Sequence, residues 1–392
     1  MGNTLLQEAK QFHDELVSWR RELHQIPELD ISLPQTVRFV ASKLDEMQIP
    51  YQIMEDCSCI AAQIGKGSKC FMLRSDMDAL PVVEESGLPF ASTNGCMHGC
   101  GHDLHATILL GAAKLLKAHE AELNGVVKLL FQSGEETFNG AKAAFAGGVL
   151  ENPHVDAAFA MHVFAGVAPG VISYGVQAMA SVYGFKIVLT GRGGHGSQPE
   201  ICIDPINAGV EVYHALQSLI ARECPPSAEA ALTIGQFTAG NAANVIPEYC
   251  VLQGTLRTFD KKVTELLIRR INEIVPAVAS AFRCGCKIEE LSNVPSVICN
   301  EALNEEFLES IRSLEGNFQF QGGLHLMGSE DFSIFTDAIP ASYFVIGAGV
   351  EDESKRVGQH NPKVMFNEDC LAQGAAIYTK VALDWLKNHG ND

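Results

Sequence analysis

Short apolar runs alternate with amphipathic segments along most of this 392-residue chain, and this alternation limits its possible folds more than any other feature. Apolar runs near 58–64, 70–75, 126–132 and 156–161 have the length of strands, and 103–119 has the 3.6-residue period of a helix. Strands that alternate with helices are typical of an α/β domain with a mostly parallel central sheet. We therefore expect an α/β fold of that kind.

A second, smaller module is predicted within residues 180–292. Its apolar pattern has the order strand, helix, strand, strand, helix, strand, from "VYGFKIVLTGRG" to "CKIEEL". This order is the split βαβ, or ferredoxin-like, arrangement. The flanking segments 1–179 and 293–392 are predicted to form one discontinuous domain, because the two ends of an inserted module can lie close together.

The charge balance of the chain excludes two kinds of partner. Asp and Glu number 47 against 28 Lys and Arg, which gives a formal net charge of −19 at pH 7. Nucleic acids and anionic membrane surfaces bind basic patches, so neither is expected as a partner.

No window approaches about 18 uninterrupted apolar residues, so no transmembrane helix is expected. Twelve cysteines without a secretory signal predict a reduced, cytoplasmic protein.

Acidic and histidine side chains follow the predicted strands at the points where these strands end. "FMLRSDMD" ends with Asp76 and Asp78, "LLFQSGEE" ends with Glu135 and Glu136, and "AAFAMH" ends with His162. Open α/β sheets bind their ligands at the carboxyl ends of their strands, so these side chains are expected to meet there. A metal ligand beside a general base would explain two adjacent glutamates, whereas a solvated acidic loop is the simpler alternative.

The densest group of potential metal ligands lies in "CMHGCGHDLH", residues 96–105. Metal sites need several nitrogen, sulfur or oxygen donors around one point, and Cys100 and His102 could supply two of them. A helix start capped by Asp103 with incidental histidines is the structural alternative. A thiol redox site fits the spacing worse, because three residues separate Cys96 from Cys100.

Motifs over residues 20–370 occur in the order found in one metallopeptidase family. They are "RRELHQIPEL", "SDMDALP", "HGCGHDLH", "QSGEE", "MHVF", "GRGGHGSQP", "NVIP", "LMGSEDFS" and "HNPKVMF". The chain resembles the family of aminoacylases and glutamate carboxypeptidases, and is most similar to its amidohydrolase branch. This branch includes hippurate hydrolase, N-acyl-amino-acid deacylases and plant indole-acetyl-amino-acid hydrolases. The resemblance implies a dinuclear metallohydrolase domain with an inserted lid domain at 180–292.

The resemblance also implies roles for individual residues. The metal ligands would be Cys100, His102, Glu136, His162 and His360. They would hold two divalent ions per subunit, which could be Mn²⁺, Zn²⁺, Ni²⁺ or Co²⁺. Glu135 would be the general base for a metal-activated water. Asp78 and Asp103 would orient the ligand histidines.

The lid residues matched to the family motifs would complete the site. His195 and Asn244 would bind the substrate, with His195 crossing a dimer interface to reach a carbonyl, and Arg257 would bind a substrate carboxylate. The resemblance thus implies a homodimer formed through the lid. Glu200 departs from the family pattern, since this branch usually has histidine there.

The preferred hypothesis is a metal-dependent amidohydrolase that acts on small-molecule N-acyl amino acids with an acetyl, benzoyl or similar acyl group. A dipeptidase or aminopeptidase acting on short peptides is the alternative within the same chemistry. A zinc-stabilised protein without turnover is the alternative from another class. A structural zinc site would be closed by four protein ligands, so a spare glutamate at position 135 argues against it.

Overall fold

The computed structural model describes residues 4–390, which form two compact units. Unit 2 comprises Met179–Val297 and His325–Glu330, and unit 1 comprises the other described residues. No helix within residues 4–390 combines the length and the apolar character needed to cross a membrane.

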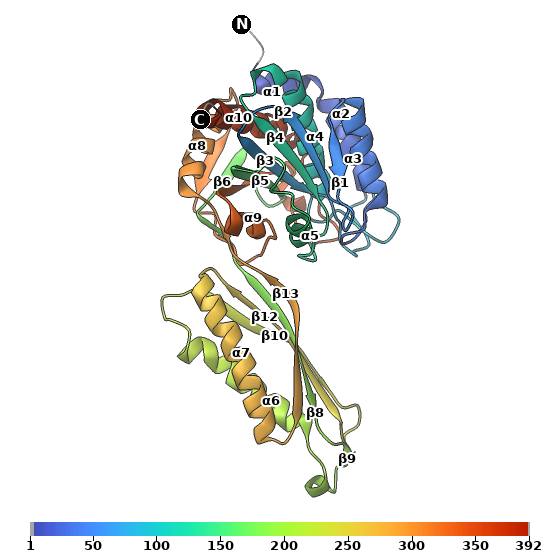
Figure 1. The fold of residues 1–392 in the computed structure, drawn as a ribbon. Coiled ribbons are helices and arrows are strands. Elements are labelled where there is room, and N and C mark those ends of the chain that lie inside the picture. Colours follow the sequence, from blue (N-terminus) through green and yellow to red (C-terminus); the bar gives the residue numbers. More distant parts are fainter. Residues whose placement is uncertain (1–3, 391–392) are drawn as a thin grey trace. The chain divides into compact units, whose positions relative to one another are not determined.

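Unit 1 is built on an eight-stranded sheet with the strand order β1-β2-β4-β3-β5-β16-β6-β15 (Figure 1). Its strands are β1 (Tyr51–Ile53), β2 (Ile60–Gly65), β3 (Cys70–Asp76), β4 (Val126–Gln132), β5 (Ala157–Phe164), β6 (Val171–Tyr174), β15 (Gln319–Gly322) and β16 (Ala341–Gly347). The central strands β4, β3, β5 and β16 are parallel to one another. The predicted mostly parallel α/β sheet is therefore confirmed.

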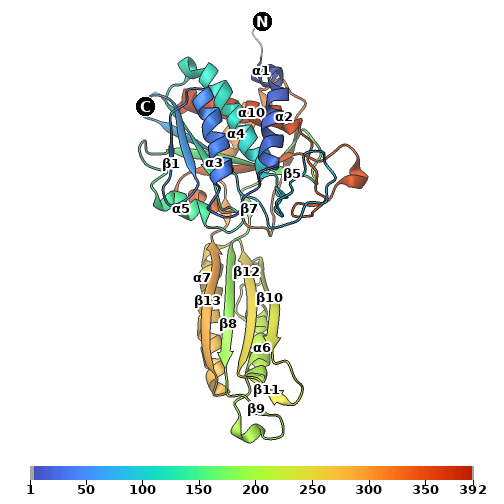
Figure 2. The ribbon, with the colours of Figure 1, turned by 90° about the vertical axis from the view of Figure 1, so that its right-hand side faces the viewer.

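Helices cover both faces of this sheet. They are α1 (Leu5–Gln11), α2 (His13–His24), α3 (Pro34–Glu46), α4 (His102–Ala118), α5 (Gly140–Ala146), α8 (Glu301–Arg312), α9 (Ser333–Ala338) and α10 (Cys370–His389), with short 3₁₀ turns at Glu120–Glu122 and Glu353–Lys355. Helices α4 and α10 pack on one face, and α5 and α9 pack on the other (Figures 1 and 2). The side chains of β3 show this division, because Phe71 stacks on Trp385 of α10 whereas Arg74 lies against Phe332 on the opposite face.

Two features of unit 1 differ from the sequence-based expectation. The amphipathic pattern of residues 4–22 predicts one continuous helix, but the chain breaks at Phe12 into α1 and α2. No proline or glycine stands there, so the local sequence lacks the usual signal for a break. The short strands β6 and β15 were not predicted, because each has just four residues and pairs near the edge of the sheet.

Unit 2 has the predicted order β-α-β-β-α-β. Its main elements are β8 (Val182–Thr190), α6 (Pro205–Arg222), β10 (Ala230–Ala239), β12 (Tyr249–Thr258), α7 (Lys261–Ala281) and β13 (Gly285–Val294). The four strands form an antiparallel sheet in the order β10-β12-β8-β13, which is the split βαβ topology. The ferredoxin-like module is therefore confirmed.

The minor elements of the chain are short strands and one further turn. They are β7 (Gln177–Met179), β9 (Gly194–His195), β11 (Val245–Ile246), β14 (Val297–Ile298) and a 3₁₀ turn at Pro199–Ile201. Both long helices of unit 2 begin at a capping aspartate, since Asp204 accepts the N–H of Ile206 and Asp260 accepts those of Lys262 and Val263. Their apolar faces cover the sheet and form a separate hydrophobic core.

Candidate active site

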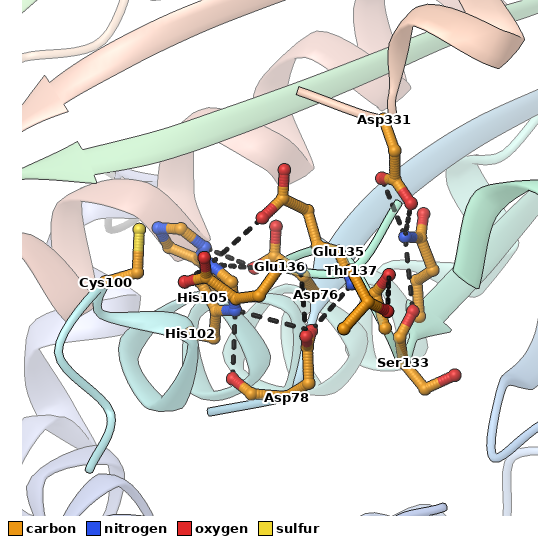
Figure 3. A network of polar contacts seen from close by, with 12 residues as sticks. Asp76, Asp78, Cys100, His102, His105, Ser133, Glu135, Glu136, Thr137 and Asp331 are labelled. Atoms are coloured by element: carbon orange, nitrogen blue, oxygen red, sulfur yellow. Dashed lines mark hydrogen bonds and ion pairs between the residues drawn. The ribbon is translucent and has the colours of Figure 1, made fainter. Parts of the chain in front are cut away.

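The predicted site residues of unit 1 meet at the carboxyl ends of three neighbouring parallel strands, β4, β3 and β5. Asp76 is the last residue of β3, Glu135 and Glu136 follow β4, and His162 lies near the end of β5. Figure 3 shows Asp76, Glu135 and Glu136 together with His102 of α4. The parallel topology therefore explains why residues far apart in sequence share one site.

The loop after β4 is held by one carboxylate. Asp78 Oδ1 accepts the backbone N–H of Glu135 and Asp78 Oδ2 accepts that of Glu136, both at 3.0 Å (Figure 3). Gly134 makes the turn before them with a φ of +62°, where a Cβ would lie 2.8 Å from Ile31 Cγ2. Asp78 is thus placed to position both glutamates through their backbone.

The two predicted ligand histidines of this region each bind a backbone carbonyl oxygen through Nδ1 and direct Nε2 toward other donor atoms. His102 Nδ1 donates to the carbonyl oxygen of Asp78 at 2.9 Å, and His162 Nδ1 donates to the carbonyl oxygen of Val163 at 2.8 Å. Their Nε2 atoms therefore carry the lone pairs. His102 Nε2 lies 3.9 Å from Glu136 Oε1, and His162 Nε2 lies 3.4 Å from Cys100 Sγ.

Backbone conformation brings Cys100 and His360 to the same place. Gly101, at the start of α4, has a φ of +90°, and a Cβ there would lie 2.6 Å from Val163 Cγ2. The backbone N–H of His360 donates to the carbonyl oxygen of Gly99 at 2.9 Å. His360 Nε2 then lies 3.5 Å from Glu136 Oε1.

The donor atoms fit a pair of divalent metal ions. Cys100, His102 and His162 form one group whose potential ligand atoms lie within 4.8 Å of one another, and Cys100, Glu136 and His360 form another. His102 Nε2 and Glu136 Oε1 are buried, and neither has a hydrogen-bond partner within the described part of the chain. Buried polar atoms without partners are costly, so a ligand for them is expected. The shared Cys100 suits a bridging thiolate.

Burial shifts the pKa values of several donor groups away from their ordinary values. Burial raises the pKa of Glu136 to about 7, and nearby Asp78 and Asp76 add to this although His102 opposes it. Burial also raises the pKa of the Cys100 thiol well above its ordinary value and lowers that of His162 well below its own. A divalent cation favours the deprotonated forms of all three groups, which is the state in which they can bind it.

His105 and Asp76 support the site, and the sequence analysis gave neither of them a role. His105 Nε2 accepts the backbone N–H of Val163 at 2.8 Å, and its Nδ1 donates to Asp76. Both ring nitrogens are therefore occupied. Arg74 donates to Asp76 Oδ2 at 2.7 Å and to Asp331 Oδ1 at 2.8 Å. The cluster of histidines in the motif indicated His105, but nothing in the spacing separates a ligand from a supporting residue.

Asp103 lies away from the predicted ligand histidines. Its Oδ2 accepts a hydrogen bond from His24 Nδ1 at 2.8 Å and forms an ion pair with Arg20, whose Nε also lies 2.8 Å away. The structure therefore differs from the expectation that Asp103 orients a ligand histidine. Asp103 instead connects α4 to α2. Glu84 accepts from the other nitrogen of His24 at 3.1 Å, which extends this buried network to the loop before Cys100.

Within unit 2, two of the predicted substrate-binding residues are neighbours. The strand β9, which contains His195, pairs with β11, and the N–H of Gly196 donates to the carbonyl oxygen of Asn244 at 2.8 Å. The backbone N–H of Ser197 donates to His195 Nδ1 at 3.1 Å, so the hydrogen of the neutral ring resides on Nε2. Arg257 lies apart on β12, where it contacts Ser329 and where burial lowers the pKa of its guanidinium.

A fold of this kind, with five potential metal donors gathered beside the carboxyl ends of its central strands, is typical of a dinuclear metallohydrolase. The model of peptidase family M20/M25/M40 matches residues 72–384, and the chain belongs to this family. It is a metal-dependent amidohydrolase of that family, as its motifs predicted.

Curated relatives match almost the whole chain. The IAA-amino acid hydrolase ILR1-like 4 of Arabidopsis thaliana is 36% identical over 388 residues, which cover 97% of this chain and 88% of the relative. The N-acetylcysteine deacetylase of Bacillus subtilis strain 168 is 32% identical over 382 residues, which cover 95% of this chain and 97% of the relative.

Solved structures share the fold. A protein from methicillin-resistant Staphylococcus aureus superposes with a TM-score of 0.91 at 28% identity, covering 98% of this chain and all of that one. A Bacillus subtilis protein described as a dinuclear metal binding peptidase from the M20 family superposes with a TM-score of 0.80 at 29% identity, covering 96% and 99%.

Proposed function

We propose that this protein cleaves the amide bond of N-acyl amino acids with an acetyl, benzoyl or similar acyl group. The observation that carries the proposal is the pair of donor groups that share Cys100, with Glu135 held beside them by Asp78. The names of the relatives support this substrate class, since one is an IAA-amino acid hydrolase and another an N-acetylcysteine deacetylase.

In this proposal the two donor groups hold one divalent ion each. Cys100, His102 and His162 form the first, and Cys100, Glu136 and His360 form the second. Bound metal would supply Lewis-acid chemistry, which polarises the amide carbonyl and makes water acidic. The mixture of thiolate, imidazole and carboxylate donors is compatible with Zn²⁺, Mn²⁺, Ni²⁺ or Co²⁺.

Glu135 would move the proton. Its backbone is held by Asp78, and its carboxylate Oε2 lies 4.0 Å from His102 Nε2, beside the donor groups. From there it would accept a proton from the attacking water and pass it to the nitrogen of the leaving amine. The side chain is 8% exposed, so little bulk water would compete for that proton.

The lid residues would recognise the substrate. Because His195 Nε2 carries the ring hydrogen, this atom would donate to the developing oxyanion. Asn244 would add a polar contact beside it, and Arg257 would bind the substrate carboxylate in bidentate fashion.

We further propose a homodimer formed through unit 2. In this proposal His195 acts in the site of the partner subunit. Three partly exposed apolar side chains of α6, namely Ile206, Val210 and Tyr213, follow a helical spacing and support this assembly. Phe237 on the edge strand β10 adds another exposed apolar side chain.

A hydrolysis screen tests the proposed function. The metal-free protein is loaded with Zn²⁺, Mn²⁺, Ni²⁺ or Co²⁺ and given N-acetyl, N-benzoyl and longer N-acyl amino acids beside dipeptides. We expect metal-dependent release of the amino acid from N-acyl substrates whose α-amino group is blocked. Turnover restricted to peptides with a free α-amino group would contradict this and favour a dipeptidase or aminopeptidase.

A further inference from the structure

Two cysteines outside the metal site form a thiol pair between strands β1 and β2. Cys57 and Cys59 lie in the turn that joins these strands, separated by Ser58. The turn is closed by the backbone N–H of Met54, which donates to the carbonyl oxygen of Cys59 at 2.9 Å. Both cysteines are free thiols. Side chains two residues apart in a tight turn are close enough for a disulfide without a large movement of the backbone.

The two thiols have different surroundings. Cys57 lines a cavity of about 590 Å³ together with Met54, Gln63, Val149 and Asn152. Cys59 is fully buried behind it. A small solute that enters the cavity therefore meets the sulfur of Cys57 first, and Cys59 can be reached through Cys57.

The inner thiol contacts the chain that leads to Glu135. Cys59 Sγ accepts the backbone N–H of Ser133 at 3.5 Å and shares a hydrogen bond with Ser133 Oγ at 3.5 Å. Ser133 is the first residue after β4 and stands two residues before Glu135 (Figure 3). The thiol pair therefore connects the cavity to the loop that carries both catalytic glutamates.

The pair has the asymmetry of an attacking and a resolving thiol. The neighbouring Cys59 thiol, acting against burial, lowers the pKa of Cys57 to about 7. The Cys57 thiol and burial raise the pKa of Cys59 well above its ordinary value. A substantial thiolate fraction near neutral pH makes Cys57 the better nucleophile of the two.

We propose that Cys57 and Cys59 are a redox-sensitive modification site for small hydroperoxides, and that its oxidation lowers the activity of the metal site. In the first step the Cys57 thiolate attacks one peroxide oxygen, which breaks the O–O bond and leaves a sulfenic acid. The hydroxide or alkoxide that leaves takes a proton from solvent and departs as water or an alcohol. In the second step Cys59 loses its proton and displaces hydroxide from that sulfur, which forms the Cys57–Cys59 disulfide and a second water. Two thiols are oxidised and one peroxide is reduced.

The disulfide would change the contacts of Ser133. Once Cys59 Sγ is bonded to Cys57, it must turn toward Cys57 and away from its 3.5 Å contacts with the N–H and the Oγ of Ser133. The buried Ser133 then loses a partner, and the loop that positions Glu135 shifts. A small displacement of a catalytic group lowers the rate roughly tenfold or more.

The experiment treats the metal-loaded enzyme with one equivalent of hydrogen peroxide, then alkylates remaining thiols and digests the protein with trypsin. The tryptic peptide 44–66 contains Cys57 and Cys59 and no other cysteine. We expect this peptide to resist alkylation and to be lighter by two hydrogen atoms, while activity falls roughly tenfold and returns with dithiothreitol. The peptide mass is independent of the substrate, so it tests the site even if the proposed function is wrong.

Variants distinguish oxidation of Cys57 and Cys59 from oxidation of Cys100. Cys57→Ser, with Cys57→Ala as a second version, should keep basal activity and metal content but resist inactivation by peroxide. Cys286→Ser, which removes a half-buried thiol of unit 2, should remain as sensitive as wild type. Full alkylation of peptide 44–66 after inactivation, equal sensitivity of the Cys57 variants, or a disulfide formed without loss of activity would each overturn the proposal.

Discussion

Glu135 and Glu136 are adjacent, but their side chains have different surroundings. Glu136 Oε1 is buried without a hydrogen-bond partner among the described residues and lies 3.5 Å from His360 Nε2, whereas Glu135 belongs to neither donor group that shares Cys100. The backbone N–H groups of both are accepted by one carboxylate, that of Asp78. Neighbouring residues can thus divide two tasks, because adjacent side chains point in different directions while their backbone is held as a unit.

The first prediction separates the two glutamates. Glu135→Gln should retain two metal equivalents but lower kcat by at least about a thousandfold, because an amide cannot accept the proton. Glu136→Gln should instead lose metal, since a neutral amide is a poor ligand. Metal analysis and steady-state kinetics on both variants measure this. Equal metal content in the two variants would show that their roles are wrongly divided.

The second prediction concerns Asp78. In Asp78→Asn a single oxygen must replace two acceptors, so one backbone N–H of the glutamate loop loses its partner. We expect kcat to fall roughly tenfold or more, with KM changed much less, because the general base is displaced. Asp30→Asn is the matched control. Asp30 Oδ1 alone accepts from Thr137 and Asn139, so the amide keeps this contact. A similar loss of kcat in both variants would contradict the positioning role.

At the scale of elements, a buried network connects helix α2 to the loop before Cys100. Burial alone would raise the pKa of Glu84, but hydrogen bonds from His24 and Ser86 outweigh burial and lower that pKa to about 2. The ordinary value is about 4.3, so folding favours the carboxylate. Its contribution to stability is therefore complete above that value and is lost as the pH falls toward 2.

The third prediction follows from the lowered pKa of Glu84. Between about pH 5 and pH 3 the free energy of unfolding of the metal-free protein should fall more steeply for wild type than for Glu84→Gln. Urea unfolding across this range measures the difference. Glu85→Gln is the control, because Glu85 is largely exposed and lies 3.8 Å from Lys363. Parallel pH profiles of the free energy of unfolding for wild type and Glu84→Gln would show that ionised Glu84 does not stabilise the fold in this way.

At the scale of the whole molecule, the proposed dimer predicts that one site uses residues of two chains. His195→Ala should lower kcat by roughly a hundredfold while metal content and folding persist, since an oxyanion donor is lost. Mixing His195→Ala with Glu135→Gln subunits should restore about a quarter of wild-type activity, because half of the dimers are mixed and each has one intact site. Activity assays after confirmed subunit exchange test this. No recovery would place His195 in the site of its own chain or in none.

The fold class, and the meeting of acids and histidines at the strand ends, could be predicted from sequence because they depend on local patterns. The apolar run 126–132 coincides with β4, and the β-α-β-β-α-β order of unit 2 follows from alternating periodicities. Parallel strands place their carboxyl ends together, so acids and histidines that follow several strands must be neighbours. The break at Phe12 and the strands β6 and β15 depend on distant packing, which leaves little trace in the local sequence.

The amino-acid sequence by itself determined the two modules and the family, and it predicted the potential donor residues that the structure brings together. The tertiary structure decided which partner each buried polar group has. It assigns Asp103 to Arg20 and His24, and it occupies both ring nitrogens of His105. The physical reason is that hydrogen bonds of buried side chains extend over a few ångströms and depend on direction, and both are set when elements far apart in the chain pack together.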